Sequence, residues 1–233
     1  MSTLLVACVP LREWSDGRMA GWSSVSSALR SSSASSEQID FAVEVEESSS
    51  SSASSGTGAL AEQLTTDGFL LVGDKNAPHT LTVFTNTSCP YCHEFQTTMF
   101  QAIAEEFVLP GTMNIQVAIV PLKKYPDSTV QAASLLCATA QGKGLPMLQE
   151  LFGGRSHDRK SVIAMAKTVG LPQKAFTTCL DAKETKNILA TQQSLINEHG
   201  VTLIPEFLLD SRQQIGLPSY ADLRGWIQNN VNR

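Results

Sequence analysis

The feature that most constrains this chain is the sequence Cys-Pro-Tyr-Cys at 89–92, which joins a predicted strand to a predicted helix. Residues 80–86 are dominated by Thr, Val and Phe, which favour strands, and turn-forming residues lie on either side. After the cysteine pair, large apolar residues recur every four positions, as on one face of a helix: Phe95, Met99, Ile103 and Phe107. A strand that leads directly into such a helix indicates an α/β fold.

The remaining elements follow in a regular order. The patterns predict a second strand at 114–120, helices at 127–141, 161–169, 172–180 and 181–200, a hairpin at 206–209 and 213–216, and a final helix capped by Ser219. Asp181 and Glu184 resemble a capping box at the start of the fourth of these helices. The predicted order is therefore β-α-β, a block of helices, and then β-β-α.

The composition excludes several classes of protein. The chain has 233 residues, of which 42% are hydrophobic and 17% charged, which allows one domain of ordinary size plus an appendage. No stretch approaches the roughly 18 consecutive apolar residues that a membrane-spanning helix needs. The net charge is −5 and only 6% of residues are aromatic, so we expect no nucleic-acid partner.

The first quarter of the chain differs sharply from the rest. Residues 23–55 contain 16 serines among 33 residues, and we expect 23–59 to be a disordered linker because so polar a segment cannot bury enough apolar surface to fold. Residues 1–22 resemble a truncated signal or lipoprotein segment, in which Cys8 would carry the lipid. The folded domain is then expected at 60–233, with a helical insertion at about 125–200.

The cysteine pair has a specific chemical consequence at the start of a helix. Cys89 is expected at the helix N-terminus, where unpaired backbone N–H groups and the helix dipole favour a negative charge. Pro90 suits the first turn because its missing N–H is not needed there. A stabilised thiolate is reactive and leaves readily, so a Cys89–Cys92 disulfide would be oxidising, with Cys92 as the less accessible resolving thiol.

Other readings of the same residues remain open. A structural zinc site would need a second pair of ligands, and no second C-x-x-C or H-x-x-x-H motif exists, so no metal is expected. The string Cys89-x-x-Cys92-His93 also fits the covalent attachment of a c-type haem. A purely structural disulfide is the third alternative.

Two further cysteines, Cys137 and Cys179, lie in the predicted helical block. They are either two buried thiols that act as small apolar residues, or a second disulfide that closes a long loop. The residues alone favour neither.

Several segments resemble the DsbA-like branch of the thioredoxin superfamily. They are 73–78 (Gly-Asp-Lys-Asn-Ala-Pro), 81–84 (Leu-Thr-Val-Phe), 89–95 (Cys-Pro-Tyr-Cys-His-Glu-Phe), 136–143, 176–180 and 200–207 (Gly-Val-Thr-Leu-Ile-Pro-Glu-Phe). The resemblance extends from about residue 66 to the end of the chain. It implies an α/β, thioredoxin-like fold with an inserted helical subdomain, in which 136–143 and 176–180 belong to the insertion.

The resemblance also implies roles for individual residues. The family exchanges disulfides with cysteine-containing proteins through the C-x-x-C pair, which here has Pro90-Tyr91 as its central dipeptide. Pro205 would be the superfamily's cis-proline, and Ile204 before it would contact the backbone of the substrate. Two positions depart from the common pattern: relatives often have an acid where this chain has Val83, and an Asp where it has Asn86.

Together these inferences predict an extracytoplasmic thiol–disulfide oxidoreductase, and more specifically an oxidase. It would need no cofactor beyond its redox-active disulfide and would be a monomer that is recycled by a membrane oxidase or reductase. Its contact with the membrane would be limited to an N-terminal anchor. The alternatives are an isomerase or reductase of the same fold, and a non-catalytic tethered module that binds haem or protein.

Overall fold

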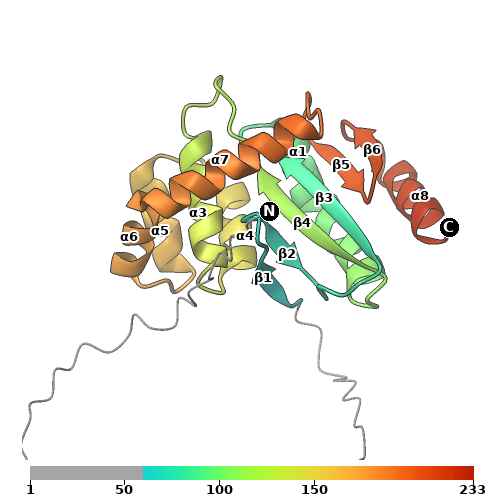
Figure 1. The fold of residues 1–233 in the computed structure, drawn as a ribbon, viewed down its shortest axis with the longest axis horizontal. Helices are drawn as coiled ribbons and strands as arrows, with labels where there is room; N and C mark the ends of the chain where they lie inside the picture. Colours follow the sequence, from blue (N-terminus) through green and yellow to red (C-terminus); the bar gives the residue numbers. More distant parts are fainter. Residues whose placement is uncertain (1–59) are drawn as a thin grey trace, which may run out of the picture. The chain divides into compact units, whose positions relative to one another are not determined.

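The computed structural model describes residues 60–233, which form a single six-stranded sheet flanked by helices (Figure 1). The strands occur in the spatial order β1-β2-β4-β3-β5-β6, and β3 and β4 are parallel while all other neighbours are antiparallel. Their bounds are β1 Glu62–Leu64, β2 Leu70–Val72, β3 His79–Thr85, β4 Met113–Ile119, β5 Glu206–Leu209 and β6 Arg212–Ile215.

The helices lie in three groups. A continuous helical stretch that begins at Pro90 and ends at Val108 connects β3 to β4. Five helices then separate β4 from β5: α3 Ser128–Thr139, α4 Gly144–Gly153, α5 Arg159–Thr168, α6 Gln173–Asp181 and α7 Lys183–Glu198. Helices α3 to α6 gather beside the sheet, α7 runs from them back toward β5, and α8 (Tyr220–Val231) follows β6 (Figure 1).

The central strands bury both of their faces. Val83 of β3 and Phe207 of β5 lie directly opposite each other and belong to the main core, which also contains the cysteine pair. The neighbouring pair, Phe84 and Glu206, faces the other side, where Phe84 packs with Ile196 of α7 in a smaller apolar cluster. Because successive side chains of a strand alternate between faces, each residue of β3 is committed to one of these two environments.

The predicted element order is confirmed, with three differences. Strands β1 and β2 were not predicted, since three residues are too few to show a periodic pattern. Helix α4 was also not predicted because its sequence contains Gly144 and Pro146. The capping box at Asp181 was wrong: this residue ends α6, where its carboxylate binds the Arg159 guanidinium (2.7 Å), and Ala182 precedes α7 instead.

The helix after the cysteine pair is not uniformly α-helical. It contains two π-helical turns, Phe95–Met99 and Ala104–Val108. A four-residue repeat drifts by about 40° per step around an α-helix of 3.6 residues per turn, and the wider π turns reduce this drift. The four apolar residues of the predicted face are consequently all buried: Phe95, Met99, Ile103 and Phe107.

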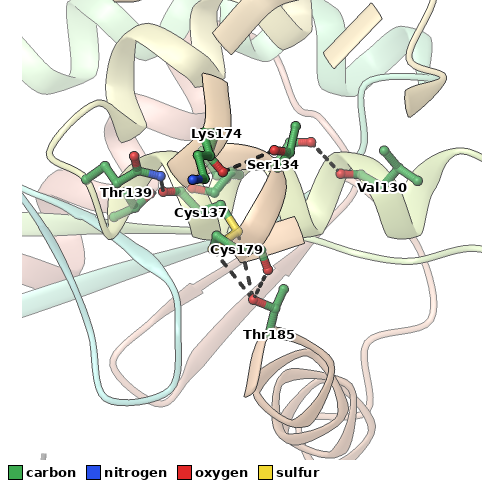
Figure 2. Close-up of a disulfide and its surroundings, with 10 residues drawn as sticks. Val130, Ser134, Cys137, Thr139, Lys174, Cys179 and Thr185 are labelled. Carbon is green, nitrogen blue, oxygen red and sulfur yellow. Dashed lines mark hydrogen bonds between the residues drawn. A yellow bond between two sulfur atoms is a disulfide. The ribbon is translucent and has the colours of Figure 1, made fainter. Parts of the chain in front are cut away.

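A disulfide between Cys137 and Cys179 ties α3 to α6, with Cα atoms 5.9 Å apart. Figure 2 shows the bond beside Thr185 of α7, whose hydroxyl donates to the Cys179 carbonyl oxygen (2.7 Å). Of the two alternatives that the sequence left open, the structure has the bonded one. The bond and the hydroxyl together link three of the five inserted helices.

The sequence-based inferences about residues 1–22, the linker at 23–59 and lipid attachment at Cys8 lie outside the described residues. Within 60–233, the structure contains no helix with the length and apolar character needed to cross a membrane.

The disulfide is expected to stabilise the domain substantially, because it joins residues 42 positions apart. With Cys89 and Cys92 both replaced by alanine, only this bond in the domain responds to a reductant. Urea unfolding of that variant should give a free energy of unfolding about 4 kcal/mol lower with dithiothreitol than without it. Equal stability under the two conditions would show that the bond does not constrain the unfolded chain as expected.

Candidate functional site

Asn86 shapes the turn between β3 and the cysteine pair. Its side chain is fully buried and uses both ends of the amide: the nitrogen donates to the Val120 carbonyl oxygen (2.9 Å), and the oxygen accepts from the Ser88 backbone N–H (2.9 Å). Its backbone carbonyl also accepts from the Cys89 N–H (3.1 Å). An aspartate could not make the donor contact, so this departure from the family pattern has a structural use here.

The turn delivers Cys89 to the start of the helix. Cys89 is the N-cap residue, with extended backbone angles (φ −95°, ψ 121°), and its carbonyl oxygen accepts from the His93 N–H (3.0 Å). Its sulfur lies 3.4 Å from the Ile204 carbonyl oxygen, toward which the thiol is directed as a donor. The Cys89 side chain is therefore held between the first helical turn and the loop that precedes β5.

Cys92 lies one turn further along the helix and is fully enclosed. Its exposed fraction is 0%, against 8% for Cys89, so the two thiols differ in access as the sequence predicted. Burial raises the pKa of the Cys92 thiol to about 12, an effect that the hydroxyl of Thr85 partly offsets. Reduced Cys92 is consequently a neutral thiol at physiological pH.

The loop before β5 completes the site. The Ile204–Pro205 peptide bond is cis, Pro205 is buried and Ile204 is half-buried. Two large apolar side chains near the pair are exposed to solvent: Tyr91 between the cysteines at 63% and Leu203 in the loop at 61%. Exposed apolar side chains beside a reactive sulfur provide a surface on which an extended peptide can rest.

The structure brings most of the residues singled out from the sequence into one place: Cys89, Pro90, Tyr91, Cys92, Ile204 and Pro205. Cys137 and Cys179 lie apart from it, in the helical insertion. Thr85 and Leu203 were not singled out, although Thr85 could have been found as a polar residue two positions after Val83 on the same face of a strand. Among residues 60–233, no three potential metal-binding side chains of Cys, His, Asp or Glu come together.

Comparison with known proteins identifies a thioredoxin fold, as the sequence motifs predicted. A model of the thioredoxin family matches residues 65–229. No curated protein matches the sequence closely enough to count as a relative.

Several solved structures superpose on the chain over nearly their whole length. Oxidised BdbD from Bacillus subtilis has a TM-score of 0.65 at 16% identity, covering 75% of this chain and 99% of its own. Alpha-DsbA1 from Wolbachia pipientis has a TM-score of 0.63 at 21% identity, covering 72% and 94%. A periplasmic thioredoxin-like protein from Salmonella enterica serovar Typhimurium has a TM-score of 0.60 at 17% identity, covering 72% and 92%.

The raised pKa of Cys92 predicts a pH dependence of stability. Between pH 9 and 12 the folded protein keeps a proton that the unfolded chain releases, so stability that is present below pH 9 is lost as the pH rises. As the pH rises above 9, we expect the free energy of unfolding of Cys89→Ala to fall relative to that of the double variant Cys89→Ala/Cys92→Ala. The difference should change by at most about 1.4 kcal/mol per pH unit.

Both variants leave the Cys137–Cys179 disulfide intact, so no reductant is needed and other titrating groups cancel in the comparison. Urea unfolding at several pH values from 8 to 10.5 measures the difference. Parallel pH profiles for the two variants would mean that Cys92 titrates like an exposed thiol.

Proposed function

The chain belongs to the thioredoxin family, and from that premise we propose that this thiol–disulfide oxidoreductase is an oxidase that gives its Cys89–Cys92 disulfide to other proteins. The observation that supports the proposal best is the unequal burial of the two cysteines. Cys89 keeps 8% of its surface exposed and lies beside the loop that carries the exposed Leu203, whereas Cys92 has no exposed surface. The attack of a substrate is thereby directed to one sulfur of the disulfide.

The exchange has two steps. A substrate thiolate attacks the Cys89 sulfur, a bond forms between those two sulfurs, the Cys89–Cys92 bond breaks, and the electron pair leaves on Cys92, which then takes up a proton. A second thiolate of the substrate attacks the substrate sulfur of this mixed disulfide, and Cys89 leaves as a thiolate. The substrate has lost two electrons and gained a disulfide, while the protein ends with two reduced cysteines.

The position of Cys89 favours this direction of transfer. Cys89 occupies the N-cap of the helix, where unpaired backbone N–H groups and the positive end of the helix dipole lie beside the residue. A helix start is a position from which a cysteine leaves readily in disulfide exchange, and a disulfide with a good leaving group is a better oxidant.

The loop at 203–205 and Tyr91 would hold the substrate. Ile204 lies directly against Cys89 through its carbonyl oxygen, and the buried Pro205 follows it across the cis peptide bond. Tyr91 and Leu203 offer apolar contacts to the residues around the substrate cysteine. We infer that substrates bind in an unfolded or extended form, because the contacts are made by one loop and one helical turn.

An extracytoplasmic location fits these features. The Cys137–Cys179 disulfide is a kind of bond that persists in oxidising compartments, and one of the similar structures is that of a periplasmic protein. Each turnover leaves the pair reduced, so a membrane oxidase would have to withdraw two electrons from it. The protein would act as a monomer, and a lipid on Cys8 would be its only link to the membrane.

The proposal is tested with reduced, unfolded ribonuclease A as the substrate. The oxidised protein should restore ribonuclease activity at a rate at least tenfold above that of glutathione disulfide alone at equal disulfide concentration. Cys89→Ala should restore none. Cys92→Ala, activated at Cys89 by glutathione, should form a mixed disulfide with the substrate that is visible on a non-reducing gel.

A matched control is the double variant Cys137→Ala/Cys179→Ala, which removes the distant disulfide and should remain active at a temperature where it is folded. If ribonuclease activity returned faster from scrambled ribonuclease than from reduced ribonuclease, the protein would be an isomerase instead. Full activity of Cys89→Ala would contradict the whole proposal, and a visible absorption band in the purified protein would favour the haem-binding alternative.

A further inference from the structure

The hydroxyl of Thr85, the last residue of β3, is buried without a hydrogen-bond partner in the part of the chain that the structure describes. The Thr85 side chain is 1% exposed, and its oxygen has no hydrogen-bond partner among the described residues. A buried hydroxyl without a partner costs free energy and is rare in native proteins. An unpaired hydroxyl at this position, near the cysteine pair, is therefore expected to have a use that offsets its cost.

Strand geometry places this hydroxyl on the same side of the sheet as the cysteines. Val83 and Thr85 are two positions apart in β3 and therefore share a face, and Val83 belongs to the core cluster that contains Cys89 and Cys92. Phe84 points to the opposite face, as does Glu206, which pairs with it across the strands. Thr85 is thus the polar side chain that β3 directs toward the cysteine pair.

Besides the Thr85 hydroxyl, one other group lowers the pKa of the Cys92 thiol, the backbone N–H of Asn86. The titratable group that faces Cys92 is the thiol of Cys89. His93 is next in the helix, but its ring is exposed and lies 6.3 Å from that of Phe152 in α4. The buried carboxylate of Glu206 is on the other face of the sheet, where it accepts from the Gln213 side chain.

Disulfide exchange nevertheless requires Cys92 to carry a negative charge as a thiolate. With a pKa of about 12, only about one Cys92 in 10⁵ is a thiolate at pH 7. The Thr85 hydroxyl makes no hydrogen bond to the neutral thiol, but it lowers the pKa of Cys92 because it favours the charged form of the sulfur. The unpaired Thr85 hydroxyl is therefore a free donor, and the buried Cys92 sulfur needs a donor when the disulfide opens or closes.

We propose that Thr85 is a positioning residue whose hydroxyl donates a hydrogen bond to the Cys92 sulfur while that sulfur leaves or attacks as a thiolate. The inference rests on the proposed exchange at Cys89–Cys92. When a substrate opens the disulfide, the departing electron pair on Cys92 accepts the Thr85 hydrogen bond before the sulfur is protonated. When a mixed disulfide at Cys89 is displaced by Cys92, the proton of Cys92 passes to solvent and the leaving thiolate takes one up, so protons and electrons balance.

The test measures ring closure after the reduced protein reacts with glutathione disulfide. Acid quenching and mass spectrometry follow the Cys89–glutathione adduct as it converts into the Cys89–Cys92 disulfide. Thr85→Val keeps the shape of the side chain and removes the hydroxyl. Closure in this variant should be about tenfold slower at pH 7, as expected for the loss of one hydrogen bond to a charged group.

Three readouts separate this role from a structural one. Opening of the oxidised Thr85→Val variant by glutathione should slow by the same factor, so the equilibrium constant with glutathione should change less than twofold. The variant should be no less stable than the parent protein, because an unpaired buried hydroxyl is lost. Thr85→Ser should restore the closure rate, and the closure rate of Thr85→Val at about one pH unit above 7 should match that of the parent at pH 7.

Thr82→Val is the matched control, since it makes the same change at a buried position of β3 on the opposite face. Its closure rate should equal that of the parent protein. Equal closure rates for Thr85→Val and the parent would overturn the inference while leaving the proposed function intact. If the parent protein itself never formed the Cys89–Cys92 disulfide, the proposed function would fail first.

Discussion

The site depends on the way Asn86 fixes the junction between β3 and the helix that follows it. Three hydrogen bonds of this one residue hold the turn, and the turn places Cys89 at the N-cap with its sulfur against the Ile204 carbonyl oxygen. The same geometry places Cys92 one turn inside, where it is fully buried. The unequal burial of the two cysteines, on which the proposed direction of attack rests, follows from where the strand ends.

The helical insertion and the sheet position the other side of the site, which is the loop that precedes β5. The loop with the cis Ile204–Pro205 bond connects α7 to β5, so its position depends on the helical insertion at one end and on the sheet at the other. Cys137–Cys179 and Thr185 tie α3, α6 and α7 together. The insertion therefore supports the loop against which Cys89 rests, even though its own disulfide lies apart from the cysteine pair.

Most of the architecture could be predicted from the sequence because the central strands and the helices carry clear periodic patterns. Strands β1 and β2 are too short for such a pattern, and α4 contains the helix-breaking residues Gly144 and Pro146. The cysteine motif alone was enough to predict that Cys89 starts a helix and that Cys92 lies deeper, as the structure has them. Thr85 could not be assigned a role in this way, because its importance lies in an unpaired buried hydroxyl, which depends on tertiary packing and not on residue type.

The most direct test of the account is the reduction potential of the Cys89–Cys92 pair. The protein is equilibrated at pH 7 with glutathione buffers of graded composition, quenched with acid and alkylated, and the oxidised fraction is measured by mass spectrometry. The account predicts a reversible disulfide whose potential is less negative than the roughly −270 mV of thioredoxin. A potential at or below that value would contradict the oxidase, and failure of the two sulfurs to join would contradict the site itself.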